Sequence, residues 1–417
     1  MKTVRLAAVG LGVALAMAAS AAPAAEPRAR DEALWTAAKD LIGEQTALLG
    51  QIVNIDSGTS NAEGGRIVAE VLTPKLKKIG MTVQRVPAEA DGLADNLVAR
   101  IQGQGRGRIL MIGHLDTVFE KGEAARRPFR VDGDRAYGPG VADEKGGVVQ
   151  GLMALRLLSD AGFTDFAEIV FLIESSEEMG SPGSRQLIDG LLTEADVELN
   201  LEPGDAPDSV TVWRKGSATY TIAVKGRAAH AGIAPEEGHN AAVELINQLR
   251  ANSVFPTSGT GLTANITTIK AGVRHNIIPD AAEAQINVRV RDMADFARVE
   301  KVFQANADKP RVPGTTVTVT RRSAYPAMPL TPATEELANR AAAIYGELGL
   351  TLGRGGNGGA SESALAAYAG VPALDGLGPV GGGSHSEDEY LELNSLTPRL
   401  YLLARLLMEL GAGPPPR

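Results

Sequence analysis

The stretch RILMIGHLDTV (residues 108–118) organises the fold of this chain. Its apolar first half, 108–113, predicts a buried strand, and His114 and Asp116 follow directly. Side chains two residues apart along a strand point to the same side, so His114 and Asp116 can face one space. A metal-binding histidine is commonly oriented by a carboxylate on its other ring nitrogen. The stretch therefore predicts a core strand that ends at a candidate metal ligand.

Helices and strands alternate on both sides of this stretch. The pattern predicts helices at 31–52 and 147–162 and strands at 108–113, 167–173 and 197–202. Such alternation is typical of a mostly parallel α/β sheet with helices on its faces. In these sheets, functional groups collect beyond the carboxyl ends of the strands.

The order changes between residues 216 and 323. Strands are predicted at 218–224, 262–269, 283–290 and 315–320, with helices at 240–252 and 293–306. This is the β-α-β-β-α-β order of ferredoxin-like domains. Helices at 331–348 and 396–411 follow, on either side of a glycine-rich stretch at 353–363. We therefore expect an α+β domain (216–323) inserted into a larger α/β domain made of residues 32–215 and 324–417.

The first 25 residues differ from the rest of the chain. Lys2 and Arg5 precede an apolar run, Leu6 to Met17, and small residues follow it. The run is too short to span a membrane, so the pattern predicts a secretory signal peptide and a periplasmic or secreted protein. A retained N-terminal anchor is the alternative.

Composition narrows the possible chemistry. The 417-residue chain is long enough for two domains, and it contains no cysteine, which excludes disulfides and thiol catalysis. His, Asp and Glu remain as zinc ligands. Removing residues 1–25 deletes Lys2 and Arg5 and no acid, which moves the formal net charge from −9 to −11. An acidic chain is a poor partner for nucleic acid or for an anionic membrane surface.

Acids and histidines recur where the predicted apolar strands end. They are His114, Asp143, Glu177, Glu178, Glu202 and His385. Singly, each is as well explained by a structural or solvated role. Together, two histidines and three acids suffice for a two-metal site with ions about 3.5–4 Å apart and one bridging carboxylate. Of two adjacent glutamates, one can bind metal while the other stays free as a base.

Six motifs, in this order and spacing, carry a specific resemblance. They are GHLDTV, YGPGVADEKGG, SSEEMGSPGSR, LEP, VKGRAAHAG and HSEDEY. From about residue 35 to its C-terminus the chain resembles the dinuclear zinc peptidases and deacylases, the family that includes glucarpidase (a glutamate carboxypeptidase), acetylornithine deacetylase, succinyl-diaminopimelate desuccinylase and peptidase T. The resemblance implies a zinc-hydrolase catalytic domain with an inserted lid, and a homodimer formed through the lids.

The resemblance also implies a role for each matching residue. Asp143 would bridge two zinc ions, with His114 and Glu202 completing one site and Glu178 and His385 the other. Glu177 would be the general base, and Asp116 would orient His114.

Three lid residues match the family pattern as well. His230 would stabilise the oxyanion, from its own subunit or across the dimer; a helix cap is its alternative. Arg289 and Asn276 would bind the substrate carboxylate, since a guanidinium fork pairs with a carboxylate through two hydrogen bonds. A solvated strand position is the alternative for Arg289. His239 and His275 match no ligand and are expected to be structural or surface residues.

Two departures bear on specificity. GASE, 359–362, stands where relatives have GGTD, and glucarpidase's lysine and second arginine have no clear counterpart beyond Arg321 and Arg322. We expect an exported zinc carboxypeptidase that releases a C-terminal amino acid, with glutamate on an acyl or folate-like group as the favoured case. An N-acyl-amino-acid deacylase and a noncatalytic zinc-binding protein are the alternatives.

Overall fold

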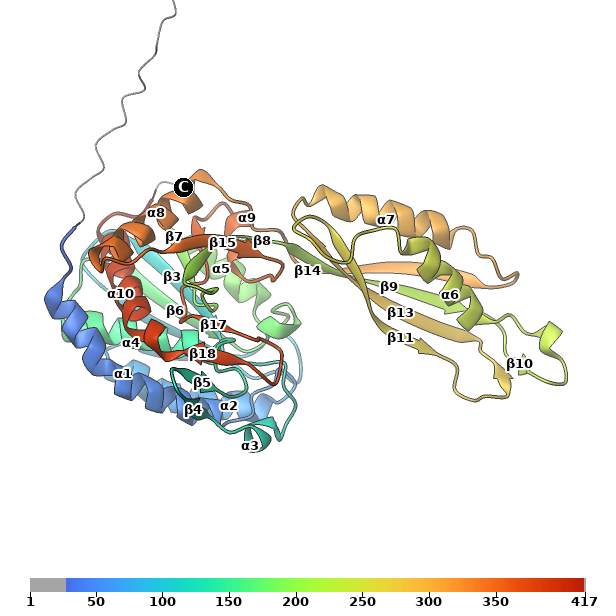
Figure 1. Cartoon of the computed structure of the whole chain (residues 1–417), viewed down its shortest axis with the longest axis horizontal. Helices are drawn as coiled ribbons and strands as arrows, with labels where there is room; N and C mark the ends of the chain where they lie inside the picture. The colour runs from blue at the N-terminus through green and yellow to red at the C-terminus, as the bar shows by residue number, and fades with distance from the viewer. Residues whose placement is uncertain (1–27, 416–417) are drawn as a thin grey trace, which may run out of the picture.

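The computed structural model describes residues 28–415, which form two bodies (Figure 1). The predicted signal peptide, 1–25, lies outside the described residues. None of the helices within 28–415 is long and apolar enough to cross a membrane.

The larger body is built on a six-stranded sheet. Its strand order is β1 (Thr82–Val86), β2 (Asn96–Gln102), β6 (Glu168–Glu174), β3 (Arg108–His114), β7 (Val197–Asn200) and β16 (Ala373–Leu374). β6, β3, β7 and β16 run parallel, whereas β1 and β2 form an antiparallel edge. The mostly parallel sheet is thus confirmed, and the antiparallel edge was not predicted.

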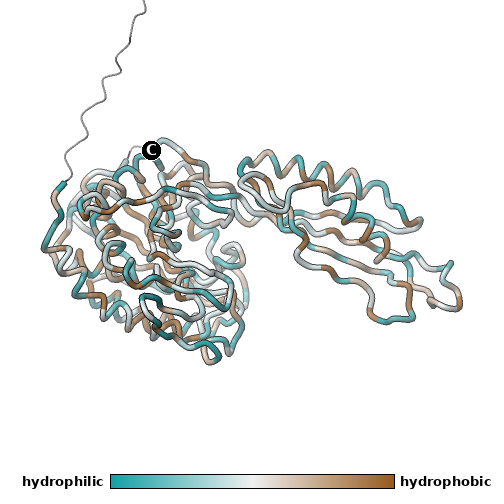
Figure 2. The backbone as a smooth tube through the Cα atoms, in the orientation of Figure 1, coloured by the Kyte–Doolittle hydropathy of each residue, from teal (hydrophilic) through white to brown (hydrophobic). Residues whose placement is uncertain are grey.

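The central strands are apolar along their whole length because helices cover both faces of the sheet. In β3, Ile109 and Met111 belong to one core, and Leu110 and Ile112 belong to the other. The first core includes α1 (Glu32–Val53), α2 (Ala62–Lys78), α4 (Lys145–Asp160), α8 (Pro332–Glu347) and α10 (Leu396–Ala412). The second includes α5 (Arg185–Glu194) and α9 (Ser363–Tyr368). Figure 2 shows hydrophobic segments concentrated inside this body.

Helix α2 was not predicted, because residues that are unfavourable in helices interrupt its apolar periodicity. Gly64, Gly65 and Pro74 lie within it, and these residue types are unfavourable inside helices. Its amphipathic face still packs Val68 and Leu72 into the core, and the Asn61 side chain caps its first turn. Tertiary burial outweighs local propensity here.

The smaller body, which we call the lid, is a four-stranded antiparallel sheet covered by two helices. The strand order is β11 (Thr263–Ala271), β13 (Ala281–Val290), β9 (Gly216–Lys225) and β14 (Thr316–Tyr325). Helices α6 (Ala241–Asn252) and α7 (Ala294–Ala307) pack on it around their own core. The predicted β-α-β-β-α-β order is confirmed, and β14 runs beyond its predicted end at residue 320.

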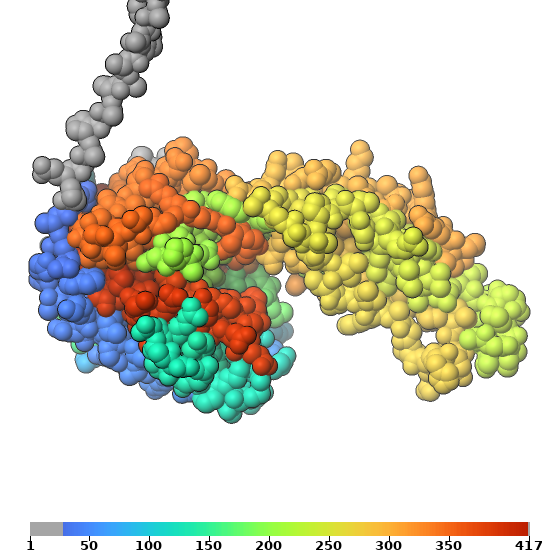
Figure 3. Space-filling view, in the orientation of Figure 1, coloured from blue at the N-terminus to red at the C-terminus, as the bar shows by residue number. Residues whose placement is uncertain are grey.

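Two chain segments join the lid to the larger body. One leads from β8 (Ser209–Arg214) into β9, and the other leaves β14 at Tyr325. At the junction the backbone N–H groups of Arg214 and Met328 each donate to the other residue's carbonyl, at 3.1 Å. Gly216 is required there, because a Cβ would lie 2.8 Å from the Ala327 nitrogen. On the face seen in Figure 3 the two bodies meet at a narrow junction.

Candidate active site

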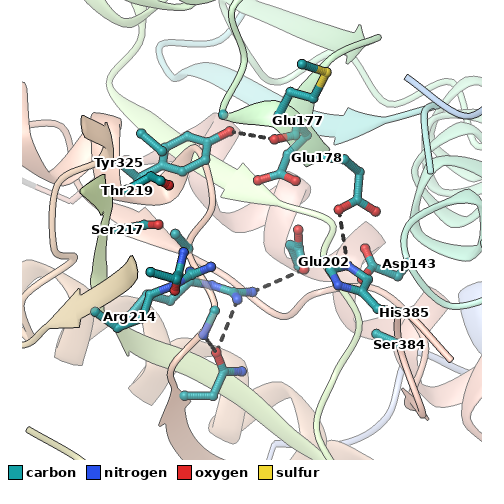
Figure 4. A pocket seen from close by; sticks show the side chains of 18 of the residues that line it. Asp143, Glu177, Glu178, Glu202, Arg214, Ser217, Thr219, Tyr325, Ser384 and His385 are labelled. Carbon is teal, nitrogen blue, oxygen red and sulfur yellow. Dashed lines mark hydrogen bonds and ion pairs between the residues drawn. The ribbon is translucent and has the colours of Figure 1, made fainter. Parts of the chain in front are cut away.

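The six acids and histidines singled out in the sequence come together at the carboxyl edge of the large sheet, as this class of fold predicts. His114 ends β3, Glu177 and Glu178 lie in a short 3₁₀ helix after β6, and Glu202 lies two residues beyond β7. Asp143 comes just before α4, and His385 lies between β17 (Gly381–Gly382) and β18 (Tyr390–Glu392). Figure 4 shows Glu178, Glu202, Asp143 and His385 close together.

These residues form two groups that share Asp143. The first contains His114, Asp143 and Glu202, and the second contains Asp143, Glu178 and His385; within each group the candidate ligand atoms lie within 4.8 Å of one another. Asp143 divides its oxygens, with Oδ1 3.2 Å from His114 Nε2 and Oδ2 3.3 Å from His385 Nε2. One carboxylate thus faces both groups, which is the arrangement of a bridging ligand.

Asp116 ties two parts of the site together. The Nδ1 atom of His114 is 3.0 Å from the Asp116 carbonyl oxygen and 3.4 Å from its carboxylate Oδ1. The same carboxylate accepts hydrogen bonds from the backbone N–H groups of Glu177, at 3.2 Å, and Glu178, at 3.3 Å. Because β3 ends at His114, this placement comes from the loop rather than from strand alternation.

The site concentrates acidic groups in a buried region. Burial, with nearby acids, raises the pKa of Glu177 well above its usual range. Burial raises the pKa of Glu202 to about 7, although the Arg214 guanidinium opposes the shift. Hydrogen bonds to Asp143 and Glu178 raise the pKa of His385 to about 10. This excess of negative charge is what a bound cation would neutralise.

Two buried atoms point to a missing electropositive partner. Within residues 28–415, neither His114 Nε2 nor Glu178 Oε1 has a well-aligned hydrogen-bond partner. Buried polar atoms without partners are rare, and an ion is one explanation for them. Imidazole nitrogens and carboxylate oxygens are ligands that suit zinc. The donor set therefore fits a pair of divalent cations.

A cavity of about 390 Å³ opens between these groups and the lid. This size suits a small ligand. The lid wall includes Arg289, Arg322 and Ser217, and Tyr325 lies beside Glu177 (Figure 4). Arg289 donates to Asn287 Oδ1 at 2.9 Å and to the Gly358 carbonyl at 3.4 Å. The arginine is thus held in the cavity wall and not in open solvent.

The structure separates the other two predicted lid residues from this cavity. His230 and Asn276 are neighbours at the far end of the lid, where β10 (Ala229–His230) lies (Figure 1), and the N–H of Ala231 donates to the Asn276 carbonyl. β9 alone extends from cavity residue Ser217 to Lys225, about 27 Å at strand spacing. The expectation that Asn276 lies near Arg289 is therefore wrong within one chain, because the length of the strands separates them.

The remaining histidine alternatives are settled by local contacts. Asn240, not His230, caps α6, since its side chain accepts the N–H of Val243. His239 pairs through its backbone with Arg227, and His275 is exposed. Neither lines the cavity.

Several buried polar residues of the site were not predicted from the sequence. Arg214 contacts Glu202, and Asp375 pairs with Arg214. Glu362, in the departing GASE segment, accepts hydrogen bonds from Asn200 at 3.0 Å and from the Tyr325 hydroxyl at 3.3 Å. No spacing pattern marks these residues, because each comes from a different segment. The loop position of Asp375, after a short apolar run, was the one available signal.

Comparison with known proteins agrees with this geometry. Residues 110–409 match the sequence profile of peptidase family M20/M25/M40. The chain is 39% identical to Carboxypeptidase G2 from Pseudomonas sp. (strain RS-16) over 390 residues, which covers 92% of this chain and 93% of that protein.

Solved structures show the same fold. A tripeptidase from Staphylococcus aureus aligns with a TM-score of 0.74 at 22% identity, covering 89% of this chain and 98% of that one. A dinuclear metal-binding M20 peptidase from Bacillus subtilis aligns with a TM-score of 0.63 at 15% identity, covering 92% and 100%. The resemblance seen in the motifs is thereby confirmed: the chain belongs to peptidase family M20/M25/M40 and is a hydrolase of the metallopeptidase type.

Proposed function

We propose that the chain is an exported, zinc-dependent carboxypeptidase that releases a C-terminal amino acid, with glutamate favoured, from an acyl or folate-like group. The observation that carries the proposal is the placement of Arg289 and Arg322 in one cavity with the two acidic groups that meet at Asp143. A substrate carboxylate held by the arginines would set its amide bond before those groups.

In this proposal the ligands are divided as the two groups suggest. His114 and Glu202 would hold one zinc ion, Glu178 and His385 would hold the other, and Asp143 would contribute to both sites. When bound, the ions supply Lewis-acid activation of water and of the scissile carbonyl.

Glu177 is the proton carrier. It lies in the cavity wall beside Glu178, and within residues 28–415 no histidine or arginine forms an ion pair with it. It takes a proton from the attacking water and returns one to the leaving amine nitrogen.

The preference for glutamate rests on the two arginines. Among the described residues neither Arg289 nor Arg322 has an ion-pair partner, so both are available to an anionic ligand. Burial lowers the pKa of Arg289, and a guanidinium with little water around it gains more from a carboxylate partner. Two guanidinium groups, the half-buried Arg289 and the exposed Arg322, suit the two carboxylates of a C-terminal glutamate. The 39% identity to Carboxypeptidase G2 supports the same assignment.

Assembly through the lid completes the proposal. His230 is too far from the cavity to act in its own subunit, so we assign it, with Asn276, to the site of a second copy in a homodimer. There it would stabilise the developing oxyanion.

Metal removal and a substrate panel test the activity. Chelation should abolish hydrolysis by the mature chain, because it removes the ions. Added zinc should restore activity, because the protein ligands remain in place. Among substrates, acyl- and pteroyl-glutamate should be hydrolysed faster than dipeptides ending in neutral residues. Full activity in protein shown by elemental analysis to be metal-free would contradict the proposal. A preference for N-acetyl amino acids irrespective of side chain would favour a deacylase instead.

A further inference from the structure

We infer that Asp375 is a positioning residue that acts through Arg214 to keep Glu202 available to the metal. The inference rests on the proposed function for the role of Glu202. Asp375 itself touches neither candidate ligand group; it lies in the loop after β16, behind the cavity wall.

Asp375 and Arg214 form a buried ion pair with two hydrogen bonds. Asp375 is 0% exposed and Arg214 is 4% exposed. The guanidinium approaches the carboxylate through two hydrogen bonds, from Nε to Oδ2 at 2.6 Å and from Nη2 to Oδ1 at 2.7 Å. Such a two-pronged contact fixes both orientation and distance.

Other groups hold Asp375 in place. The Ser361 hydroxyl donates to Oδ2 and the Gly376 N–H donates to Oδ1, both at 2.5 Å. The loop that carries Asp375 also pairs with β8, since the N–H of Thr211 donates to the Asp375 carbonyl at 2.8 Å. The carboxylate is therefore a fixed anchor for the arginine.

Arg214 makes a weaker contact with Glu202. Its Nη2 atom is 3.4 Å from Glu202 Oε2, a longer distance than either contact with Asp375. The other oxygen, Oε1, lies 3.7 Å from His114 Nε2, on the side of the metal group. One oxygen of Glu202 is thus steadied by the arginine while the other faces the candidate cation.

The charge balance explains why Asp375 is needed. A buried guanidinium with Glu202 as its only acid partner would pair with that carboxylate more closely and compete with the metal for its oxygens. Asp375 already balances Arg214 through two short contacts, so Glu202 keeps its longer contact with the arginine and its other oxygen stays available to the metal. This is how a partner outside the ligand set tunes a ligand.

Metal titration of the full mature chain tests this role. We expect Asp375→Asn to bind one zinc ion with wild-type affinity and the second about 10–100-fold more weakly, since outer partners of metal ligands have effects of this size. Isothermal titration of metal-free protein with zinc, with elemental analysis of the product, measures both sites. Asp375→Asn that binds two ions at wild-type affinity would overturn the inference.

Two further variants make the test specific. Glu347→Gln breaks another buried ion pair of the same body, with Arg405, away from the cavity. It should lower the melting temperature without changing either zinc affinity, and an equal loss of one zinc site would overturn the inference by showing a general effect of destabilisation. Arg214→Lys keeps the charge but loses the fork, so it should weaken the same single site even if Asp375→Asn does not fold; unchanged binding would overturn the inference.

The wild-type titration separates this inference from the function on which it rests. Wild-type protein that binds fewer than two ions contradicts the proposed function, and this inference with it. Wild-type protein that binds two ions, beside variants that are unaltered, contradicts this inference alone.

Discussion

Glu177 and Glu178 are neighbours in the chain with carboxylates in different surroundings. Glu178 Oε2 lies 3.1 Å from His385 Nε2, inside a ligand group, whereas Glu177 belongs to neither group. Glu177→Gln keeps the size of the side chain but cannot accept a proton from water. Its kcat should fall by a factor on the order of 10²–10⁴ with KM little changed. Steady-state kinetics on the variant measures both constants.

Glu178→Gln is the matched comparison, because it makes the same chemical change one residue away. Glu178→Gln should bind zinc more weakly at one site or lose that ion. Glu177→Gln should retain about two ions per chain, because Glu177 is not assigned as a ligand. Zinc stoichiometry by elemental analysis separates the two. An active Glu177→Gln enzyme would refute the assignment of the base.

Arg289 makes a second prediction at the scale of single residues. If its fork binds the substrate carboxylate, Arg289→Ala should cost about 2–5 kcal/mol in kcat/KM on carboxylate substrates. The loss should shrink on amidated substrates, which lack the charge. An equal loss on both would show that Arg289 holds the cavity wall through Asn287 and Gly358.

Among the site residues, those that stand in local motifs could be predicted from the sequence, whereas pairs formed by distant segments could not. His114, Asp143 and the glutamate pair stand in recognisable local contexts, so their meeting could be expected. Arg214 and Asp375 are 161 positions apart, and their pairing exists only once β8 and the loop after β16 lie together. His230 is a different case: its motif was visible, but its distance from the cavity depends on the length of β9.

At the scale of elements, strand β7 carries a buried acid that links stability to pH. Glu198 is 0% exposed, and burial, with Asp375 nearby, raises its pKa well above the usual range although Ser363 donates to it. A raised pKa means that the folded state holds the proton more tightly than the unfolded state. The stabilisation is therefore complete below the unfolded pKa of about 4.5 and is lost as pH rises toward the folded pKa.

Glu198→Gln removes this link, because the amide does not titrate. Between the two pKa values the wild type should lose about 1.4 kcal/mol per pH unit more than the variant. Denaturant unfolding of both proteins at several pH values above 4.5 measures the difference in slope. Parallel pH profiles would show that Glu198 is ionised in the fold.

The elements themselves were predicted where periodicity is strong. β3 and β6 appeared as continuous apolar runs because both their faces are buried, and the lid strands followed their own order. The edge strand β1 has only exposed and half-buried positions, without regular alternation, and α2 contains helix-breaking residues, so neither gave a clear local signal. Both elements are held by tertiary packing, and the periodicity of a sequence does not reveal such contacts.

At the scale of the whole molecule, the lid presents apolar side chains without a partner within the described chain. Ile269, on edge strand β11, is 59% exposed, and Ile246, on α6, is 58% exposed. An exposed edge strand and apolar residues are typical of an interface. We predict a homodimer by analytical ultracentrifugation, with Ile246→Lys/Ile269→Lys shifted toward monomer because a buried charge is costly.

The double variant also tests the assignment of His230. Its monomer should retain bound zinc but lose activity, since the oxyanion donor would come from the other subunit. A wild-type chain that sediments as a monomer while fully active would refute both the dimer and the role of His230 across it.

The lid sheet has a mechanical consequence, because β9 begins in the cavity wall and ends near His230. The strand is hydrogen-bonded on both sides, so a rotation of the lid about the Arg214–Met328 crossing would move the far end of the strand more than its start. A rotation of about 10° at this crossing would carry Lys225, about 36 Å away at strand spacing, by about 6 Å, and Ser217, about 10 Å away, by about 2 Å. A small shift of the lid at the cavity wall would therefore appear as a displacement several times larger at the far end of the lid. Conversely, contacts that fix the far end of the lid would restrict movement of the cavity wall.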